Sequence, residues 1–446
     1  MKLTTLTAVS PIDGRYHRHT KDLSNYFSES ALIQYRVRVE IEYFMNLCYL
    51  LPQLSTFDKA LFPQLRRLYT DMTPEDVQQI KTIELRTNHD VKAVEYFIKE
   101  KMEQMGIGEQ KEFIHFGLTS QDINNTATPL MMKEATEDLY LPLLDELIAK
   151  LKGYSTQWMG VTLLARTHGQ PASPTKMGKE ISVFVERLET QRDQLLSIPF
   201  SAKFGGATGN FNAHKVAYPN FDWIKFANTF VNETLGLKRS KTTTQIEHYD
   251  NTAAWCDCLK RINTIVLDLD RDMWTYISNN LFNQKIIGEQ VGSSAMPHKV
   301  NPIDFENSEG NIGLANALFS HLSEKLPVSR LQRDLTDSTV LRNIGVPLGY
   351  TTIAFKSTMR GLDKLLINKE AINAELQENW VVVTEGIQTI LRREGFKDPY
   401  EILKEFSRTN DKLDQKAMMK FIDTLKVDKG VRNELLKITP FNYTGI

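Results

Sequence analysis

Residues 253–287 read AAWCDCLKRINTIVLDLDRDMWTYISNNLFNQKII and contain neither glycine nor proline. The apolar residues in this stretch recur at helical spacing, at Leu259, Ile262, Ile265, Val266, Leu269, Met273, Tyr276, Ile277 and Leu281. Such spacing places them on one face of an α-helix. A helix of this length spans about 50 Å at the helical rise per residue, which is long for a small compact domain. We therefore expect a long bundle whose helices partner chains help to cover.

Other stretches carry the same helical pattern, near residues 130–158, 175–197, 305–324 and 347–367. Five long helices in one block predict a five-helix bundle in an all-α fold. Alternating strand patterns are almost absent, and TPED at 73–76 is an N-terminal helix signal. The predicted organisation is an N-terminal helical domain at 1–115, a central bundle domain at 116–367 and a small C-terminal helical domain at 368–446.

The bulk composition is that of a globular protein. The 446 residues are 41% hydrophobic and 24% charged, with a net charge of −1. Since no global field would recruit nucleic acid or an anionic membrane, an anionic ligand would need a local basic cluster. The three cysteines, Cys48, Cys256 and Cys258, form no disulfide framework and no zinc-ligand spacing. The N-terminal residues lack the apolar core of a signal peptide and no apolar run is long enough to span a bilayer, so we expect a cytoplasmic protein.

Residues 292–302 read GSSAMPHKVNP. The glycine allows backbone conformations closed to other residues, and the two prolines each remove an amide donor. This composition predicts a shaped loop between helices, and such loops often carry the chemistry of an enzyme. The alternative is a polar surface loop.

Four further polar clusters interrupt the helical pattern: TNHDVKAVEY at 87–96, HFGLTSQDINN at 115–125, ARTHGQPASPTKMGKE at 165–180 and SRLQRDLTDSTVLRN at 329–343. Each has a purely structural alternative. The first two contain ordinary helix caps, and the fourth also fits a solvated helix face with local ion pairs. The third places His168 in a turn shaped by glycine and proline, where a histidine could exchange a proton near neutral pH. The three arginines of the fourth cluster could bind a polyanion bidentately.

Several common catalytic sequences are missing. The chain has no G-x-S-x-G, no Walker A and no H-E-x-x-H sequence. The glycine-rich stretch FGGATGNFNAHK at 204–215 follows no predicted strand, so we interpret it as a break between helices rather than a dinucleotide-binding turn.

Together these clusters resemble the adenylosuccinate lyase family, the purine-pathway branch of the fumarase/aspartase superfamily. The resemblance runs from SPIDGRY at 10–16 to LTDSTVLRN at 335–343 and beyond, and SSAMPHKVNPIDFENSEGN at 293–311 is similar to the bacterial form. The sequence departs from the family at its end, where it stops at Ile446 and the family would lead us to expect a slightly longer C-terminal tail. The resemblance implies β-elimination of fumarate from adenylosuccinate, giving AMP, and from the succinylcarboxamide ribotide SAICAR, giving AICAR.

The resemblance also implies roles for individual residues. In the family the first serine of the loop is the general base, which is Ser293 here, and His168 matches the general acid. Lys299 and His89 complete the predicted catalytic set. The residues matched to substrate binding are Arg15, Tyr16, Asn88, Asp90, Thr119, Ser120, Gln245, Ser294, Asn301, Asn307, Arg333, Ser338 and Arg342. No metal and no organic cofactor are implied.

The superfamily further implies a homotetramer with a core of 20 helices and active sites that each draw on three subunits. Two other functions remain open from the sequence. One is a carboxymuconate cycloisomerase-type enzyme, whose loop can also read MPHK. The other is a non-catalytic relative kept as a structural or binding protein, against which Ser293, Lys299, Asn301 and His168 argue.

Overall fold

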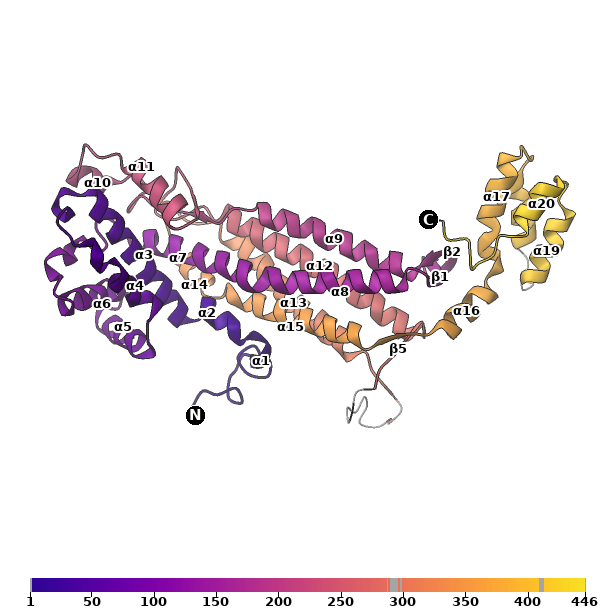
Figure 1. Cartoon of the computed structure of the whole chain (residues 1–446), viewed down its shortest axis with the longest axis horizontal. Coiled ribbons are helices and arrows are strands. Elements are labelled where there is room, and N and C mark those ends of the chain that lie inside the picture. The colour runs from indigo at the N-terminus through magenta and orange to yellow at the C-terminus, as the bar shows by residue number, and fades with distance from the viewer. Residues whose placement is uncertain (1, 287, 289–295, 297–298, 409–412, 446) are drawn as a thin grey trace. The chain divides into compact units, whose positions relative to one another are not determined.

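A computed structural model describes the chain except for residues 1, 287, 289–295, 297–298, 409–412 and 446 (Figure 1). The chain forms two compact units that each combine distant segments. The first unit contains Met1–Leu144, Gln191–Thr264 and Gly310–Lys356. The second contains Asp145–Thr190, Ile265–Glu309 and Ser357–Ile446. The division into domains at 1–115, 116–367 and 368–446 stays a prediction.

The described elements are mostly helical, as the sequence pattern predicts. The α-helices are α1 (His17–Thr20), α2 (Ser24–Phe27), α3 (Glu29–Leu50), α4 (Phe62–Thr70), α5 (Pro74–Thr87), α6 (Asp90–Gln104), α7 (Ser120–Ala135), α8 (Leu141–Trp158), α9 (Met177–Ser197), α10 (Asn212–Ala217), α11 (Trp223–Asn228), α12 (Asp250–Ser278), α13 (Ile303–Lys325), α14 (Thr336–Leu341), α15 (Gly345–Asp363), α16 (Lys369–Glu378), α17 (Thr384–Arg393), α18 (Pro399–Ser407), α19 (Gln415–Thr424) and α20 (Lys429–Leu435). Short 3₁₀ segments are η1 (Lys21–Leu23), η2 (Pro52–Leu54), η3 (Lys59–Leu61), η4 (Gly108–Phe113) and η7 (Trp380–Val383), and π segments are η5 (Thr136–Tyr140) and η6 (Thr229–Thr234).

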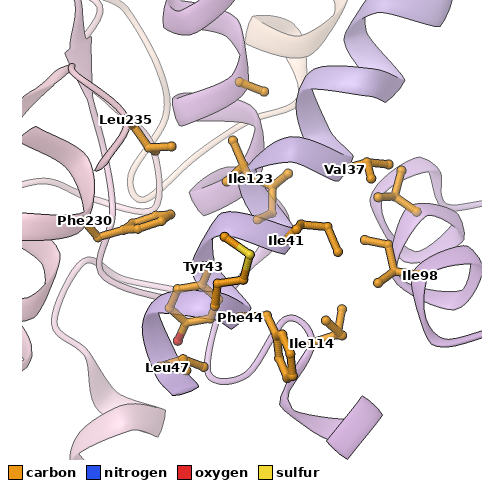
Figure 2. Packing of buried hydrophobic residues seen from close by; sticks show 14 of the residues in the cluster. Val37, Ile41, Tyr43, Phe44, Leu47, Ile98, Ile114, Ile123, Phe230 and Leu235 are labelled. Atoms are coloured by element: carbon orange, nitrogen blue, oxygen red, sulfur yellow. The ribbon is translucent and has the colours of Figure 1, made fainter. Parts of the chain in front are cut away.

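Helix α3 is the centre of the first unit's core. Ser28 caps it by accepting a hydrogen bond from the Ala31 amide at 3.1 Å. Val37, Ile41 and Phe44 follow at steps of four and three residues and are fully buried among side chains from α6, α7 and the segment before α12 (Figure 2). This helix is buried on nearly every side, so the charged residues that it also carries must find partners inside the protein.

The second unit contains the packed ends of the long helices α8, α9, α12, α13 and α15 (Figure 1). Thr358 of α15 donates a hydrogen bond to Asp270 Oδ1 of α12 at 2.8 Å, and its hydroxyl lies 2.8 Å from Ser308 Oγ of α13. Ser155 of α8 and Ser182 of α9 share a hydrogen bond of 2.6 Å. Lys150 of α8 pairs with Asp363 of α15 at 2.6 Å, and Arg187 of α9 pairs with Asp268 of α12 at 2.5 Å. The five predicted long helices therefore pack together here.

The sequence shows almost no alternating strand patterns, and the strands in the described residues are few and short, paired in three two-stranded sheets. The pairs are β1 (Thr162–Thr167) with β2 (Gln170–Lys176), antiparallel; β3 (Ser201–Ala202) with β4 (Lys238–Arg239), parallel; and β5 (Phe282–Gln284) with β6 (Leu365–Ile367), antiparallel.

Helix α12 also ends earlier than its apolar pattern suggests. It stops at Ser278, and Asn280 adopts the left-handed conformation with φ of 61°. Leu281 and Phe282 continue the apolar spacing, yet Phe282 belongs to β5. The continuation of the pattern beyond the helix therefore reflects burial in a different element. None of the helices in the described ranges is long and apolar enough to cross a membrane.

Candidate active site

The first unit contains a polar cavity of about 440 Å³. This volume is within the usual range for small-molecule sites. Seven of the predicted site residues line the cavity, from segments far apart in sequence: Asn88, His89, Asp90, Ser120, Arg333, Ser338 and Arg342. Its other lining residues are Glu84, Gln121, Asn124, Leu335 and Thr339.

One wall is the junction between α5 and α6. Asn88 ends α5 in the left-handed conformation, with φ of 49°, and its amide donates to the Glu84 carbonyl at 2.7 Å. His89 caps α6 because its Nδ1 accepts a hydrogen bond from the Lys92 amide at 3.1 Å. The helix cap that the sequence allowed at this position is therefore a histidine, rather than asparagine or aspartate.

The cap determines which nitrogen of His89 carries the proton. Since Nδ1 accepts a hydrogen bond, the neutral imidazole has its proton on Nε2. That nitrogen lies 3.4 Å from Ser120 Oγ at the start of α7, and about half of the His89 side chain is exposed. In this tautomer His89 offers the cavity a hydrogen-bond donor.

Another part of the wall comes from the segment that leads into α14 and from α14 itself. Arg333 Nη2 donates to Ser338 Oγ at 2.7 Å, and Arg333 lies 3.4 Å from Asp337 Oδ1. With its amide oxygen turned toward the guanidinium group, Gln121 accepts from Arg333 Nη2 at 2.6 Å. Neighbouring groups therefore hold Arg333 in place at the cavity surface.

Arg342 reaches the cavity from the residue that follows α14. Its Nη1 donates to Glu29 at 2.7 Å and its Nη2 donates to Asp90 Oδ2 at 3.1 Å. Burial opposes ionisation of Asp90, but the guanidinium groups of Arg36 and Arg342 outweigh it and hold the pKa of that carboxyl group below its usual value. The two arginines and Asp90 therefore form one charged group beside the cavity.

The start of α7 is anchored by a buried ion pair. Thr119 is the N-cap residue, and its amide donates to Asp122 Oδ2 at 2.8 Å. Asp122 and Lys203 are both completely buried, with Nζ 2.8 Å from Oδ1. Asp122 also accepts from the amides of Gly205 and Gly206, at 2.8 and 3.1 Å. This pair connects the glycine-rich stretch to the helix that presents Ser120.

Four predicted residues of the same unit do not line this cavity: Arg15, Tyr16, Thr119 and Gln245. The Arg15 guanidinium lies 5.8 Å from the centre of the Tyr16 ring. The Gln245 amide donates to the Ala207 carbonyl at 3.2 Å. Their assignment to substrate binding stays a prediction.

The second unit carries His168, which lies at the tip of the β1–β2 hairpin. Thr167 pairs with Gln170, and the two residues between them have positive φ, 55° at His168 and 75° at Gly169. This is the conformation of a two-residue hairpin turn. Arg166 braces the turn by donating to the Gly169 carbonyl at 3.2 Å and by pairing with Glu375 of α16. His168 is exposed on this supported turn.

Part of the loop at 292–302, from here on called the signature loop, lies outside the described residues, including Ser293 and Ser294. Lys299 is exposed, and its amide donates to the Met296 carbonyl at 3.1 Å. Asn301 precedes α13 and is half-buried. Asn307 lies on α13, where its side-chain amide donates to Ser357 at 2.7 Å.

Sequence reasoning missed Gln121, Asn124 and Arg36. Gln121 and Asn124 line the same cavity as Ser120, and Asn124 is one helical turn beyond Ser120. That four-residue spacing was the signal that could have identified it. Arg36 gave no signal, because it lies in the apolar run of α3; it forms hydrogen bonds to Asp90 and Asn124 of the site. Within the described ranges, no three His, Cys, Asp or Glu side chains group as a metal site.

Comparisons with known proteins show which family the chain belongs to. Residues 14–315 match the family model described as Lyase, and residues 329–444 match that described as Adenylosuccinate lyase C-terminal. An adenylosuccinate lyase of Dictyostelium discoideum is 57% identical over 100% of this chain and 98% of its own length. Those of Escherichia coli (strain K12) and Vibrio cholerae are each 48% identical with the same coverage.

Two solved structures share the fold. The 3-carboxy-cis,cis-muconate lactonizing enzyme of Pseudomonas putida has a TM-score of 0.74 at 17% identity, covering 95% of this chain and 94% of that chain. The β-carboxy-cis,cis-muconate cycloisomerase of Acinetobacter calcoaceticus has a TM-score of 0.70 at 16% identity, covering 95% of both chains. Because identities this low speak only for the fold, the much higher identity to the lyases decides the family. The chain belongs to the adenylosuccinate lyase family of the fumarase/aspartase superfamily.

Proposed function

We propose that this enzyme eliminates fumarate from adenylosuccinate to give AMP, and from SAICAR to give AICAR, in purine nucleotide biosynthesis. The observation that carries the proposal is the 440 Å³ cavity, in which Arg333 and Arg342 lie with His89, Ser120 and Ser338. Both substrates bear a phosphate and two carboxylates. A chain with a net charge of −1 needs such a local group of cations to hold them.

The reaction needs a base, an acid and groups that stabilise negative charge. A proton leaves the succinyl carbon next to a carboxylate, and the charge of the resulting carbanion spreads into that carboxylate as an aci-carboxylate. The bond from the neighbouring carbon to nitrogen then breaks, fumarate forms and the nitrogen takes up a proton. Donors placed in advance around the aci-carboxylate lower the barrier to the first step.

We assign the proton abstraction to Ser293 and the protonation of the leaving nitrogen to His168. Because a serine hydroxyl is a very weak acid, Lys299, Asn301 and the amides of the signature loop must stabilise its alkoxide. The exposure of His168 on a hairpin held by Arg166 supports its assignment as the general acid. Exposure gives an incoming substrate access to the imidazole.

The first unit supplies the binding groups in this proposal. His89, with its proton on Nε2, donates to the substrate rather than accepting its proton. Arg333, Ser338 and Arg342 bind the phosphate. No metal and no organic cofactor take part.

We further propose a homotetramer in which three subunits contribute to each active site. The bundle helices support this by exposing large apolar side chains that a partner could cover. In the second unit these include Val183 and Trp274, which are 42% and 43% exposed. In the first unit, Leu314 of α13 is 52% exposed.

A competition experiment tests whether one site serves both substrates. Purified protein is given adenylosuccinate and SAICAR separately and then together, and AMP, AICAR and fumarate are separated by chromatography. The proposal expects both to release fumarate and each to inhibit the other competitively. Release of fumarate from only one of them, without inhibition by the other, would limit the function to that substrate.

A further inference from the structure

Arg36 is a buried arginine behind the cavity, and the mechanism above does not use it. Only 3% of its side chain is exposed. Its Nε donates to Asn124 Oδ1 at 2.9 Å and its Nη2 donates to Asp90 Oδ2 at 2.7 Å. Its Nη1 has no hydrogen-bond partner within the described ranges. Burial lowers the pKa of Arg36, and Asp90 opposes that shift. A residue chosen for stability alone would not leave a buried charged group incompletely paired.

Arg36 and Arg342 share one oxygen atom of Asp90. Oδ2 accepts from Arg36 at 2.7 Å and from Arg342 at 3.1 Å. The other oxygen, Oδ1, accepts from the Val91 amide at 2.9 Å, which fixes the carboxylate at the first turn of α6. The shorter of the two ion pairs is the one to Arg36, so Asp90 neutralises Arg342 only in part.

A second cavity, of about 110 Å³, connects Arg36 to the site. It is lined by Arg36, Ser338 and Arg342, and it shares Gln121 and Asn124 with the first cavity. The unpartnered Nη1 therefore belongs to a side chain that borders the same polar region as the proposed phosphate-binding residues.

We propose that Arg36 is a positioning residue for the anion-binding site of this enzyme. By pairing with Asp90 it holds that carboxylate between two guanidinium groups, so that Asp90 takes up less of the charge with which Arg342, also paired with Glu29, would bind the substrate phosphate. Without Arg36, the Asp90 carboxylate pairs with Arg342 alone and neutralises it more completely. The region also loses one positive charge. Both changes weaken the binding of an anion and leave the elimination step unchanged. The inference rests on the proposed function, since it takes the phosphate of that substrate as the anion.

The test replaces Arg36 by methionine, which keeps an unbranched apolar side chain but no charge, and by lysine, which keeps the charge. The matched control is Arg38→Met. Arg38 lies on the same helix and makes an equally short ion pair, 2.7 Å to Glu134. It lines a different cavity, with Tyr26 and Tyr69.

The readouts are KM and kcat for adenylosuccinate and the inhibition constant of inorganic phosphate, with thermal unfolding as a check on folding. We expect Arg36→Met to raise KM and the phosphate inhibition constant by about tenfold, equivalent to about 1.4 kcal/mol, with kcat nearly unchanged. Arg36→Lys should recover part of this loss. Arg38→Met should leave both constants at the wild-type value, because its lost pair is not part of the site.

Several results would overturn the inference. Unchanged constants in Arg36→Met would do so, as would equal changes in the Arg36 and Arg38 variants, since these indicate a structural role. A fall in kcat at constant KM would assign Arg36 to the chemical step instead. If neither Arg36 variant folds while Arg38→Met does, Arg36 is a structural residue of the core. If the wild-type enzyme releases no fumarate, the proposed function fails first, and the binding of AMP measured by calorimetry then tests Arg36 independently.

Discussion

The buried pair of Asp122 and Lys203 allows a prediction whose size follows from the structure. Both side chains have 0% exposure, and the two charged atoms are 2.8 Å apart. Asp122 additionally accepts hydrogen bonds from three backbone amides, those of Thr119, Gly205 and Gly206. Lys203 also donates to the Gly206 carbonyl at 2.5 Å. The pair therefore connects the start of α7 to the glycine-rich stretch.

Removing either charge leaves the other one buried without its partner. Burial already lowers the pKa of Lys203, and Asp122 opposes this shift. We expect Asp122→Asn and Lys203→Met each to lower the free energy of unfolding by about 3–5 kcal/mol. The double variant leaves no uncompensated charge, and the amide oxygen of the introduced asparagine can still accept hydrogen bonds from the backbone. Its loss should therefore be clearly smaller than the sum of the single losses.

Urea denaturation followed by circular dichroism measures this cycle, and thermal midpoints provide a second observable. Because the chain has two compact units, the loss of helical signal should be compared between variants as a shift of the same transition. Since subunit association also stabilises an oligomer, all variants should be measured at the same protein concentration. Single variants with native midpoints, or a double variant as unstable as the two singles combined, would refute the reasoning. Either result would mean that the pair is solvated or replaceable.

Four further predictions concern catalysis and packing. Ser293→Ala should lose turnover by orders of magnitude while still binding adenylosuccinate, which equilibrium binding and steady-state rates can separate; near-native turnover would exclude Ser293 as the base. His168→Ala should lower kcat by about 10²- to 10⁴-fold. Mixing it with the Ser293 variant should restore some activity through shared sites, and no activity after verified subunit exchange would contradict such sharing. Lys299→Ala should lower kcat more than it raises KM, if the lysine acts mainly in the transition state; the reverse pattern in steady-state kinetics would make it a binding residue. Gly178→Ala should destabilise the protein by about 1–3 kcal/mol because its Cβ would overlap backbone at the end of α8, whereas Gly153→Ala, with open space around it, should stabilise the helix by about 0.5–1 kcal/mol in thermal unfolding.

The long helices could be predicted from the sequence because their apolar residues repeat at helical spacing over many turns. The ends of these helices were harder. Leu281 and Phe282 keep the spacing of α12, yet the chain leaves the helix before Asn280, which adopts a left-handed conformation. A short apolar run fits a buried strand as well as a helix, so the pattern alone could not place this boundary.

The β1–β2 hairpin was missed for a different reason. Its second strand reads QPASPTK, and the prolines at 171 and 174 conceal any alternating pattern. The turn did leave a signal, since a residue followed by glycine between two short segments is typical of a two-residue hairpin loop. It agrees with the turn in which the sequence places His168, and the structure shows this turn to be the tip of a hairpin.

The site divides in a similar way. Residues in exposed polar clusters, such as Asn88, Ser120 and Arg333, could be selected from the sequence because polar groups interrupt the helical pattern there. Arg36 could not, since it lies inside a helix that is largely buried. Its relation to the site depends on which side chains of other helices face it, and this information is available only from the folded chain.

The most direct test of the central claim is to mix the purified wild-type protein with adenylosuccinate, follow the ultraviolet change and quantify both products. The account predicts that AMP and fumarate form in equal amounts, at a rate proportional to the protein concentration. A folded protein that binds adenylosuccinate but releases no fumarate would contradict it, and would make the cavity a binding site without the proposed chemistry.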